Sequence, residues 1–369
     1  MRLAIDVGKA ASCDGMAAWV RGLVGALAGG AGAQAGDRVV LVDLLRERPE
    51  EVAGAFGPAP ASSFENRIAD APATALRDAD VLLATTWSVP AAWRGPLAFV
   101  AYDLTFLSHP DCHTVDNRLH CLEGCLRAAL AGATFVAISE ATAAEVKRRL
   151  DVPIERLLVA YPAAAPIFRP RAAADVAARL ASRFQLAPGY VLAVGSLEPR
   201  KNLARLLAAH AQLDARVRQA RPLVVVGGGG WRNGELEQAL AAASADGAVR
   251  RLGQVADDDL VDLYCGAALF AYPSLAEGFG LPVLEAMACG TPVLSSSGSS
   301  LPEVAGDAAL LIAPEDVSAI RDGLVWLLAD DGERARLATA GAARAARFSW
   351  DDAAARILAR CRALAAGPP

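Results

Sequence analysis

The sequence predicts an α/β protein built from two doubly wound domains, each a mainly parallel sheet with helices on both faces. A buried strand, a glycine-containing loop and a helix follow one another over residues 2–27, and the same order begins again at residues 190–195. The chain has 369 residues, and a single hydrophobic core stops growing beyond about 250–300 residues. We therefore expect domains over residues 1–165 and 166–347, followed by a C-terminal segment, 348–369.

Composition and charge limit the class of protein. Hydrophobic residues make up 54% of the chain, but many are alanines, and we find no run of about 18 apolar residues that would suggest a spanning helix. The net charge of −5 argues against a nucleic-acid-binding surface, which needs to be basic. Met1-Arg2 leads directly into a strand-like stretch without a signal-peptide pattern. We expect a cytoplasmic protein whose seven cysteines are reduced thiols.

In the first domain, polar and aromatic side chains follow predicted strands. Buried strands are expected at residues 38–45, 80–86, 97–101 and 133–138. Ligands bind outside the carboxyl ends of strands in open α/β sheets, and Trp87, Tyr102 and Asp103 follow two of these strands. These strand ends are therefore candidates for a ligand pocket, with plain packing as the alternative for Trp87.

In the second domain, two adjacent cations follow the strand at residues 190–195. They belong to the segment Glu198-Pro199-Arg200-Lys201-Asn202, which is expected to start a helix. Arginine can bind phosphate oxygens in a bidentate manner, whereas lysine supplies a mobile point charge. The pair predicts a clamp for a diphosphate, and a solvated basic pair is the alternative.

The stretch Tyr272–Thr291 holds two carboxylates, Glu277 and Glu285, with seven residues between them that include Gly278-Phe279-Gly280. Proline is tolerated in a first helical turn and glycine often ends a helix, so we expect a loop and then a helix from Pro282 to Cys289. A helix N-terminus attracts phosphate, and glycines allow close approach. The flanking glutamates can accept hydrogen bonds from hydroxyls, which fits a nucleotide sugar. A strand–turn–helix junction with solvated glutamates is the alternative.

Three other patterns could indicate a dinucleotide or a metal. The glycine run 227–230 lacks the later glycine of the dinucleotide fingerprint. The triplet 257–259 of aspartates is better explained by capping and dipole complementation of the next helix. A cluster of histidines and cysteines could bind zinc, but its spacing fits no standard motif and the cysteines of the amphipathic helix 116–131 can simply pack. The cluster consists of His109, Cys112, His113, His120, Cys121 and Cys125.

Two blocks of the second half resemble the retaining GT-B glycosyltransferases of family GT4. One is the stretch from Tyr272, continuing through Pro292–Pro314, and the other is Gly195–Asn202. The segment Tyr102–Pro110 (YDLTFLSHP) is similar to a segment of bacterial mannosyltransferase-like members. The resemblance implies two Rossmann-like domains facing across a cleft, with a C-terminal helix that packs back on the N-terminal, acceptor-side domain.

The resemblance also implies roles for individual residues. Arg200 and Lys201 would stabilise the leaving diphosphate, Glu277 would bind sugar hydroxyls and Glu285 the ribose. Asp103 matches the family's segment, whereas Tyr102 stands where relatives have histidine, which suggests a pocket for a different sugar. Further donor-binding positions implied by the resemblance are Gly15, Gly195, Gln254, Val255, Gly278, Phe279, Gly280 and Leu281. Neither a metal nor another cofactor is expected.

The implied activity is transfer of a hexose, mannose or a deoxyhexose such as rhamnose, with retention of configuration. The donor would be a nucleoside-diphosphate sugar, GDP-linked, and the acceptor a hydroxyl of a growing glycan or lipid-linked carrier in O-antigen or exopolysaccharide synthesis. Glu277 acting as a covalent nucleophile is an alternative to front-face displacement. A UDP-glucose-type transferase and a non-catalytic partner protein are the alternative functions. The basic triplet Lys147-Arg148-Arg149 could touch an anionic inner-membrane surface or simply complement a helix dipole.

Overall fold

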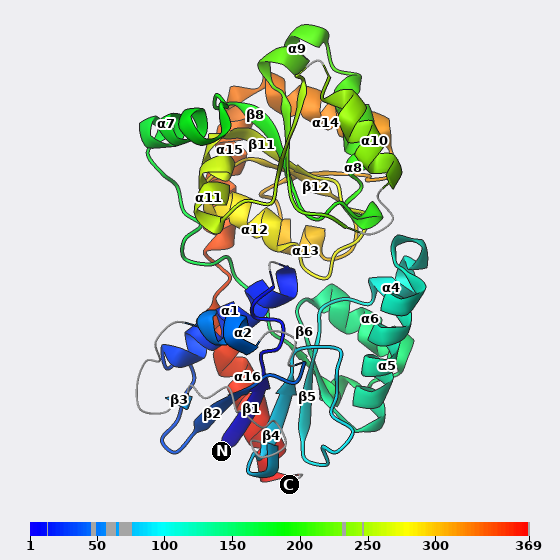
Figure 1. The fold of residues 1–369 in the computed structure, drawn as a ribbon, viewed down its shortest axis with the longest axis vertical. Helices are drawn as coiled ribbons and strands as arrows, with labels where there is room; N and C mark the ends of the chain where they lie inside the picture. The colour runs from blue at the N-terminus through cyan, green and yellow to red at the C-terminus, as the bar shows by residue number, and fades with distance from the viewer. Residues whose placement is uncertain are drawn as a thin grey trace. The chain divides into compact units, whose positions relative to one another are not determined.

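The computed structural model describes residues 1–12, 14–45, 49–56, 64–65, 76–230, 234–245 and 247–367. The chain divides into two compact units (Figure 1). The first unit comprises Met1–Leu107, Val115–Ala163 and Phe348–Pro369, and the second comprises Ser108–Thr114 and Ala164–Arg347.

The first unit is built on a parallel sheet with the order β3-β2-β1-β4-β5-β6-β7 among the described residues. The predicted strands are confirmed, with shorter ends, and the structure adds β3 and β7. The strands are β1 (Arg2–Asp6), β2 (Arg38–Val42), β3 (Phe64–Glu65), β4 (Val81–Ala84), β5 (Leu97–Ala101), β6 (Thr134–Ala137) and β7 (Leu157–Val159).

The helices of the first unit include the last one in the chain. In chain order they are α1 (Gly15–Ala28), α2 (Pro49–Gly54), α4 (Thr105–Ser108), α5 (Val115–Leu130), α6 (Glu140–Leu150), the 3-10 turn η2 (Ile154–Arg156) and α16 (Trp350–Ala366). Helix α16 packs against α1, where Trp19 and Trp350 meet edge to face with ring centroids 6.1 Å apart. A Cβ atom at Gly22 would lie 2.1 Å from the Trp350 ring, so this helix crossing requires glycine.

The second unit contains a parallel sheet with the order β10-β9-β8-β11-β12-β13 among the described residues. Its strands are β8 (Tyr190–Val194), β9 (Leu223–Val226), β10 (Val249–Gly253), β11 (Ala267–Tyr272), β12 (Val293–Ser296) and β13 (Leu310–Ile312). The helices and turns are η1 (Pro110–Cys112), α7 (Ala173–Phe184), η3 (Pro199–Lys201), α8 (Leu203–Ala211), α9 (Ala215–Ala220), α10 (Gly234–Ala243), α11 (Asp257–Gly266), α12 (Leu281–Ala288), α13 (Leu301–Ala305), α14 (Val317–Ala329) and α15 (Asp331–Ala345).

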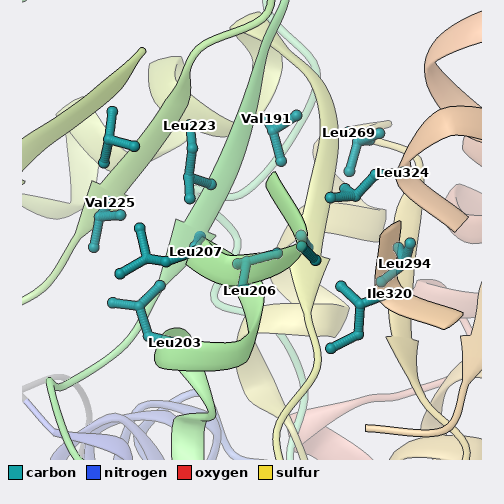
Figure 2. Packing of buried hydrophobic residues seen from close by; sticks show 14 of the residues in the cluster. Val191, Leu203, Leu206, Leu207, Leu223, Val225, Leu269, Leu294, Ile320 and Leu324 are labelled. Atoms are coloured by element: carbon teal, nitrogen blue, oxygen red, sulfur yellow. The ribbon is translucent and has the colours of Figure 1, made fainter. Parts of the chain in front are cut away.

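The core of the second unit lies between its sheet and the helices α8 and α14, which pack against each other (Figure 2). Leu203, Leu206 and Leu207 of α8 recur at helical spacing and face the sheet. The strand β9 is an unbroken run of leucine and valine, as expected where helices cover both faces of a parallel sheet. This packing fixes the carboxyl ends of β8 and β11 beside each other.

Candidate functional site

The strand order of the second unit reverses between β8 and β11, because β9 and β10 lie on one side and β12 and β13 on the other. Such a switch point opens a crevice at the carboxyl ends of the strands, where ligands bind in open α/β sheets. The two predicted motifs follow these two strands. Arg200 and Lys201 come after β8, and Glu277 comes after β11. A pocket between these strand ends is lined in part by Gly195, Lys201 and Tyr272.

Asn202 ties the two motif loops together. Its side-chain amide donates to the carbonyls of Pro273, at 2.8 Å, and Pro314, at 2.7 Å. The backbone also joins the loops, since Leu275 N donates to Arg200 O at 2.9 Å. Asn202 has a φ of 59°, a left-handed conformation that asparagine tolerates better than most residues. It ends the 3-10 turn of the cations, so α8 begins just after them at Leu203.

Glu277 is the centre of the site. One carboxylate oxygen lies 2.5 Å from a terminal nitrogen of Arg200, and the other lies 2.8 Å from Lys201 Nζ. Burial opposes ionisation of this carboxyl group, but the charges of Arg200 and Lys201 outweigh burial and lower its pKa to about 2. Glu277 is therefore an ionised hydrogen-bond acceptor at neutral pH.

Tyr272, the last residue of β11, links Lys201 to Glu277. Its hydroxyl accepts a hydrogen bond from Lys201 Nζ at 2.6 Å and donates one to Glu277 at 2.8 Å. Burial, followed by the nearby Glu277 charge, raises the pKa of Tyr272 well above its ordinary value, so the phenol keeps its proton. Sequence reasoning assigned Tyr272 no role, because a buried tyrosine at a strand end reads as core.

Arg200 is held from two sides. One terminal nitrogen donates to Ala276 O and Glu277, and the other donates to Glu198 at 2.7 Å. Glu198 is only 2% exposed, so its ion pair with Arg200 is buried. Glu198 is a second residue that sequence reasoning missed. The four ionised side chains, Glu198, Arg200, Lys201 and Glu277, form a cluster of zero net charge, which we call the switch-point cluster.

The loop from Glu277 to Gly280 is held by the serine-rich loop after β12. Ser299 Oγ accepts from Glu277 N at 2.9 Å, and Ser300 Oγ donates to the carbonyls of Glu277 and Phe279, each at 2.9 Å. Gly280 has a φ of 105°, and a Cβ atom there would lie 2.6 Å from Leu301. The predicted helix is confirmed as α12, which begins one residue early at Leu281.

Glu285 lies on α12, half-buried. Its carboxylate accepts a hydrogen bond from Tyr264 OH at 3.1 Å. Burial raises the pKa of Glu285 to about 7, and Asp257 contributes in the same direction. The side chain is thus close to half ionised at neutral pH, unlike Glu277 on the preceding loop. The two glutamates that look alike in the sequence differ in charge because only one of them has cationic neighbours.

The other candidates of the second unit line the neighbouring strand ends. Gly195 has a φ of 150°, and a Cβ atom on Gly227 would lie 1.8 Å from Gly195 O, so the ends of β8 and β9 approach closely. Gln254 and Val255 follow β10, and Gln254 lies beside Gly228. All three aspartates lie in the first turn of α11, which confirms the expected dipole complementation, but the N-cap is Ala256, so the expected capping is wrong.

The candidates of the first unit have structural partners there. The Tyr102 hydroxyl donates to Thr85 O at 2.9 Å, and its ring packs against Trp19 and Trp87. Asp103 accepts from the backbone and hydroxyl of Thr105, at 2.8 and 2.6 Å. Asp103 thus orders the start of α4. Gly15 opens α1, which is capped by the Asp14 side chain.

Asp6, which sequence reasoning did not single out, lies at the carboxyl end of β1, at the switch point of the first unit's sheet. It is fully buried and accepts from Thr86 Oγ1 at 2.7 Å and Gly8 N at 3.1 Å. Burial raises its pKa to about 6 despite these hydrogen bonds. An isoleucine–aspartate strand end gives no sequence signal that distinguishes it from a solvated turn.

The histidine and cysteine cluster is divided between the two units, since residues 108–114 belong to the second and residues 115–163 to the first. Cys121 and Cys125 are buried on α5 and face the core of the first unit, and burial raises the pKa of the Cys121 thiol to about 12. Within the described ranges, no three histidine, cysteine, aspartate or glutamate side chains gather in a way that could hold a metal ion. In the same ranges, none of the helices combines the length and the apolar composition needed to span a bilayer.

Residues 179–344 match the model of the family Glycosyl transferases group 1, and this range includes both motif loops. This stretch of the chain belongs to that glycosyltransferase family. The chain is 38% identical to O-antigen chain mannosyltransferase B of Escherichia coli over 253 residues, which cover 68% of this chain and 66% of that protein. It is 36% identical to the serotype-specific mannosyltransferase WbdA of E. coli over 226 residues, which cover 59% of this chain and 27% of that protein.

The family membership agrees with solved structures of the same fold. WaaG, a glycosyltransferase involved in lipopolysaccharide biosynthesis, superposes with a TM-score of 0.67 at 16% identity, over 97% of this chain and 99% of that one. Anabaena Alr3699/HepE in complex with UDP and glucose gives a TM-score of 0.76 at 18% identity, over 98% and 99%. The predicted GT-B fold of this chain is confirmed. The chain spans just under two thirds of the first curated relative and about a quarter of the second.

Proposed function

We propose that the protein transfers mannose or a related deoxyhexose from a GDP-linked donor, with retention of configuration, to a hydroxyl of a growing O-antigen glycan or lipid-linked acceptor. The observation that carries the proposal is the switch-point cluster, in which Glu277 holds Arg200 and Lys201 beside the N-terminus of α12. The likeness to two mannosyltransferases of E. coli supports the choice of sugar. The proposed acceptor lies at the inner membrane surface, so we propose that the enzyme contacts this surface peripherally.

The cluster is suited to a diphosphate leaving group. When the bond from the anomeric carbon to the phosphate oxygen breaks, negative charge develops on the diphosphate, and Arg200 and Lys201 stabilise it. The donor adds about two negative charges to a cluster whose own charges sum to zero. We infer that the diphosphate replaces Glu277 as the partner of at least one cation. The carboxylate oxygens released in this way then accept hydrogen bonds from the sugar hydroxyls.

The charge state of Glu277 favours front-face displacement over general base catalysis by this residue. A general base works best with a pKa near the working pH, and the pKa of Glu277 is about 2. In our proposal a phosphate oxygen of the leaving group guides the acceptor's proton, and Glu277 orients the sugar. The two cations supply the charge that stabilises the leaving group, so we propose that no metal is required.

A thermal-shift screen with GDP, UDP, ADP and dTDP, followed by a transfer assay with GDP-mannose, tests the proposal. A ligand that binds only the folded state raises the apparent melting temperature by mass action. We expect selective stabilisation by GDP, and transfer that persists in EDTA with an α-linked product. Stabilisation by UDP alone would assign a UDP-linked donor instead of a GDP-linked one. A folded protein that responds to no nucleotide would support the alternative function, a non-catalytic partner protein.

Tyr272→Phe is expected to lower kcat about tenfold while the KM for GDP-mannose changes little. The substitution removes the hydroxyl that accepts from Lys201 and donates to Glu277, and one hydrogen bond to a charged group contributes about 1.5–3 kcal/mol. Steady-state kinetics measure the effect. Tyr190→Phe removes a hydroxyl of the same unit that donates to a backbone carbonyl outside the site and is the matched control. Equal losses in both variants would contradict a positioning role for Tyr272.

The affinity for GDP-mannose is expected to increase between pH 6 and 8, by up to about tenfold, because of Glu285. Its pKa of about 7 means that the carboxyl is mostly protonated at pH 6 and mostly ionised at pH 8. A ribose hydroxyl donates best to the ionised form, so binding selects that form and releases a proton at low pH. Isothermal titration calorimetry measures both the affinity and the proton release. Glu285→Gln should remove the pH dependence, and an unchanged slope in this variant would contradict the assignment.

A further inference from the structure

Helix α5 of the first unit has apolar side chains on a solvent-exposed face as well as on its buried face. Its buried face consists of Cys121, Gly124, Cys125 and Ala128. On the other side, Val115 is 65% exposed, Leu119 61%, Leu126 46% and Leu130 89%. A soluble helix normally carries polar residues opposite its buried face, so this face needs an explanation. We propose that it pairs with α5 of a second copy of this chain, in a parallel two-fold dimer.

Three of the exposed residues, Val115, Leu119 and Leu126, take the spacing of a coiled-coil seam when the half-buried Leu122 and Ala129 are included. Apolar residues recur at intervals of four and three, which alternate the d and a positions of a heptad. We call this set the α5 seam, and it consists of Val115, Leu119, Leu122, Leu126 and Ala129. Leu122 and Ala129 are half-buried and lie at the border with the core of the first unit.

The seam is placed so that two copies can meet along it. At about 100° per residue, the seam lies roughly 130° around the helix from the centre of the buried face. Because this angle exceeds a right angle, the sheet of each first unit extends away from the partner helix. Figure 1 shows α5 at the edge of the first unit, with α6 beside it and no other labelled helix on its outer side.

Charges beside the seam select the parallel direction. Arg118 occupies a g position, and Glu123, five residues later, occupies the e position of the next heptad. In a parallel pair, g faces the following e of the other helix. Arg118 therefore meets the partner's Glu123, and the two-fold axis repeats the contact. An antiparallel pair centred on the seam would place Glu123 against the partner's Glu123, which is unfavourable.

The same charges favour a second copy over a lipid bilayer as the occupant. The exposed flanks of α5 carry Asp116 and Glu123 against Arg118 and Arg127, so their charges cancel. A helix that lies on an anionic membrane surface is rich in lysine and arginine on its polar face. The seam is only about 24 Å long, so the area that it buries is at the lower end of the range for stable interfaces. We therefore expect a reversible dimer at micromolar concentration.

Sedimentation velocity over a hundredfold concentration range, reaching about 100 µM, tests the proposal on the full chain. We expect a concentration-dependent dimer that is lost in the double variant Leu119→Gln/Leu126→Gln. The double variant Val325→Gln/Trp326→Gln changes two similarly exposed apolar residues of α14 and should leave the dimer intact.

Charge reversal tests the direction of the helices. Glu123→Arg and Arg118→Glu should each weaken the dimer at least about tenfold, since each puts like charges in contact, and the double reversal should restore it. Arg118 also donates to Phe106 O at 3.3 Å, so circular dichroism must show that its variant is folded, and Glu123→Arg gives the result independently. Failure of the double reversal to restore the dimer would overturn the parallel arrangement.

Two further outcomes would overturn the proposal as a whole. One is a wild-type chain that stays monomeric at every concentration, or a dimer that persists in Leu119→Gln/Leu126→Gln. The other is a monomer that floats with phosphatidylglycerol vesicles and loses this binding in the same variant, which would assign the α5 seam to a membrane. Neither readout uses transferase activity, so the result is independent of the proposed function.

Discussion

Lys201→Met is expected to lower kcat for sugar transfer by about 10²–10³-fold. The substitution keeps the length and apolar stem of the side chain but removes the charge that lies 2.8 Å from Glu277. In the proposed mechanism this charge meets the leaving diphosphate, whose negative charge is greatest in the transition state. Binding of the ground-state donor should change less, so we expect kcat to fall more than the affinity for GDP-mannose. Single-turnover and steady-state kinetics with GDP-mannose separate the two effects.

Arg321→Met is the matched control for this prediction. Arg321 is a partly exposed cation of the second unit that pairs with Asp322 outside the site, and its loss should leave kcat unchanged. Because Glu277 keeps Arg200 as a partner in Lys201→Met, the variant should fold normally. A Lys201→Met enzyme with wild-type kcat would rule out Lys201 as a stabiliser of the leaving group.

Glu198→Ala is expected to lower the free energy of unfolding by about 3 kcal/mol, because it breaks a buried ion pair and leaves one cation partly uncompensated. Glu198 is almost fully buried and lies 2.7 Å from Arg200. The variant should also lower kcat, since Arg200 then loses one of its two carboxylate partners. Urea denaturation measures the first effect and transfer kinetics the second.

The double variant Glu198→Ala/Arg200→Met separates the two contributions. If the uncompensated charge causes the instability, removing both partners should recover much of the lost stability without recovering activity. Glu333→Ala, which breaks a surface pair with Arg336, is the control and should cost much less stability than Glu198→Ala. A Glu198→Ala protein as stable as wild type would contradict the importance of the buried pair.

The sequence was sufficient for the two motif loops and their meeting place. Arg200, Lys201 and Glu277 are residue types whose chemistry can be read directly, and each follows a strand whose apolar run is easy to recognise. Their meeting follows from the strand order of a doubly wound sheet, which brings β8 and β11 together. The α12 helix was also predictable because Pro282 and Gly290 mark its two ends.

The residues that were missed have roles that depend on packing. Tyr272 matters because folding brings it against Lys201, a charge 71 residues away in sequence. Glu198 matters because its ion pair with Arg200 is buried. Asn202 matters because two carbonyls happen to face its amide, one of them 112 residues away. The different pKa values of Glu277 and Glu285 likewise come from their surroundings. Both residues are glutamate, so the sequence alone does not indicate the difference.

The assignment of α16 to the first unit has a consequence for how the protein is made. The second unit occupies the middle of the chain, and the first unit needs residues from both sides of it, including Trp350 against Gly22 and Trp19. During synthesis the ribosome completes the second unit before α16 emerges. The first unit must therefore wait, with the apolar surface of α1 uncovered, until the last helix arrives. Its final folding step is the docking of α16, which comes after the second unit has been synthesised and can already have folded.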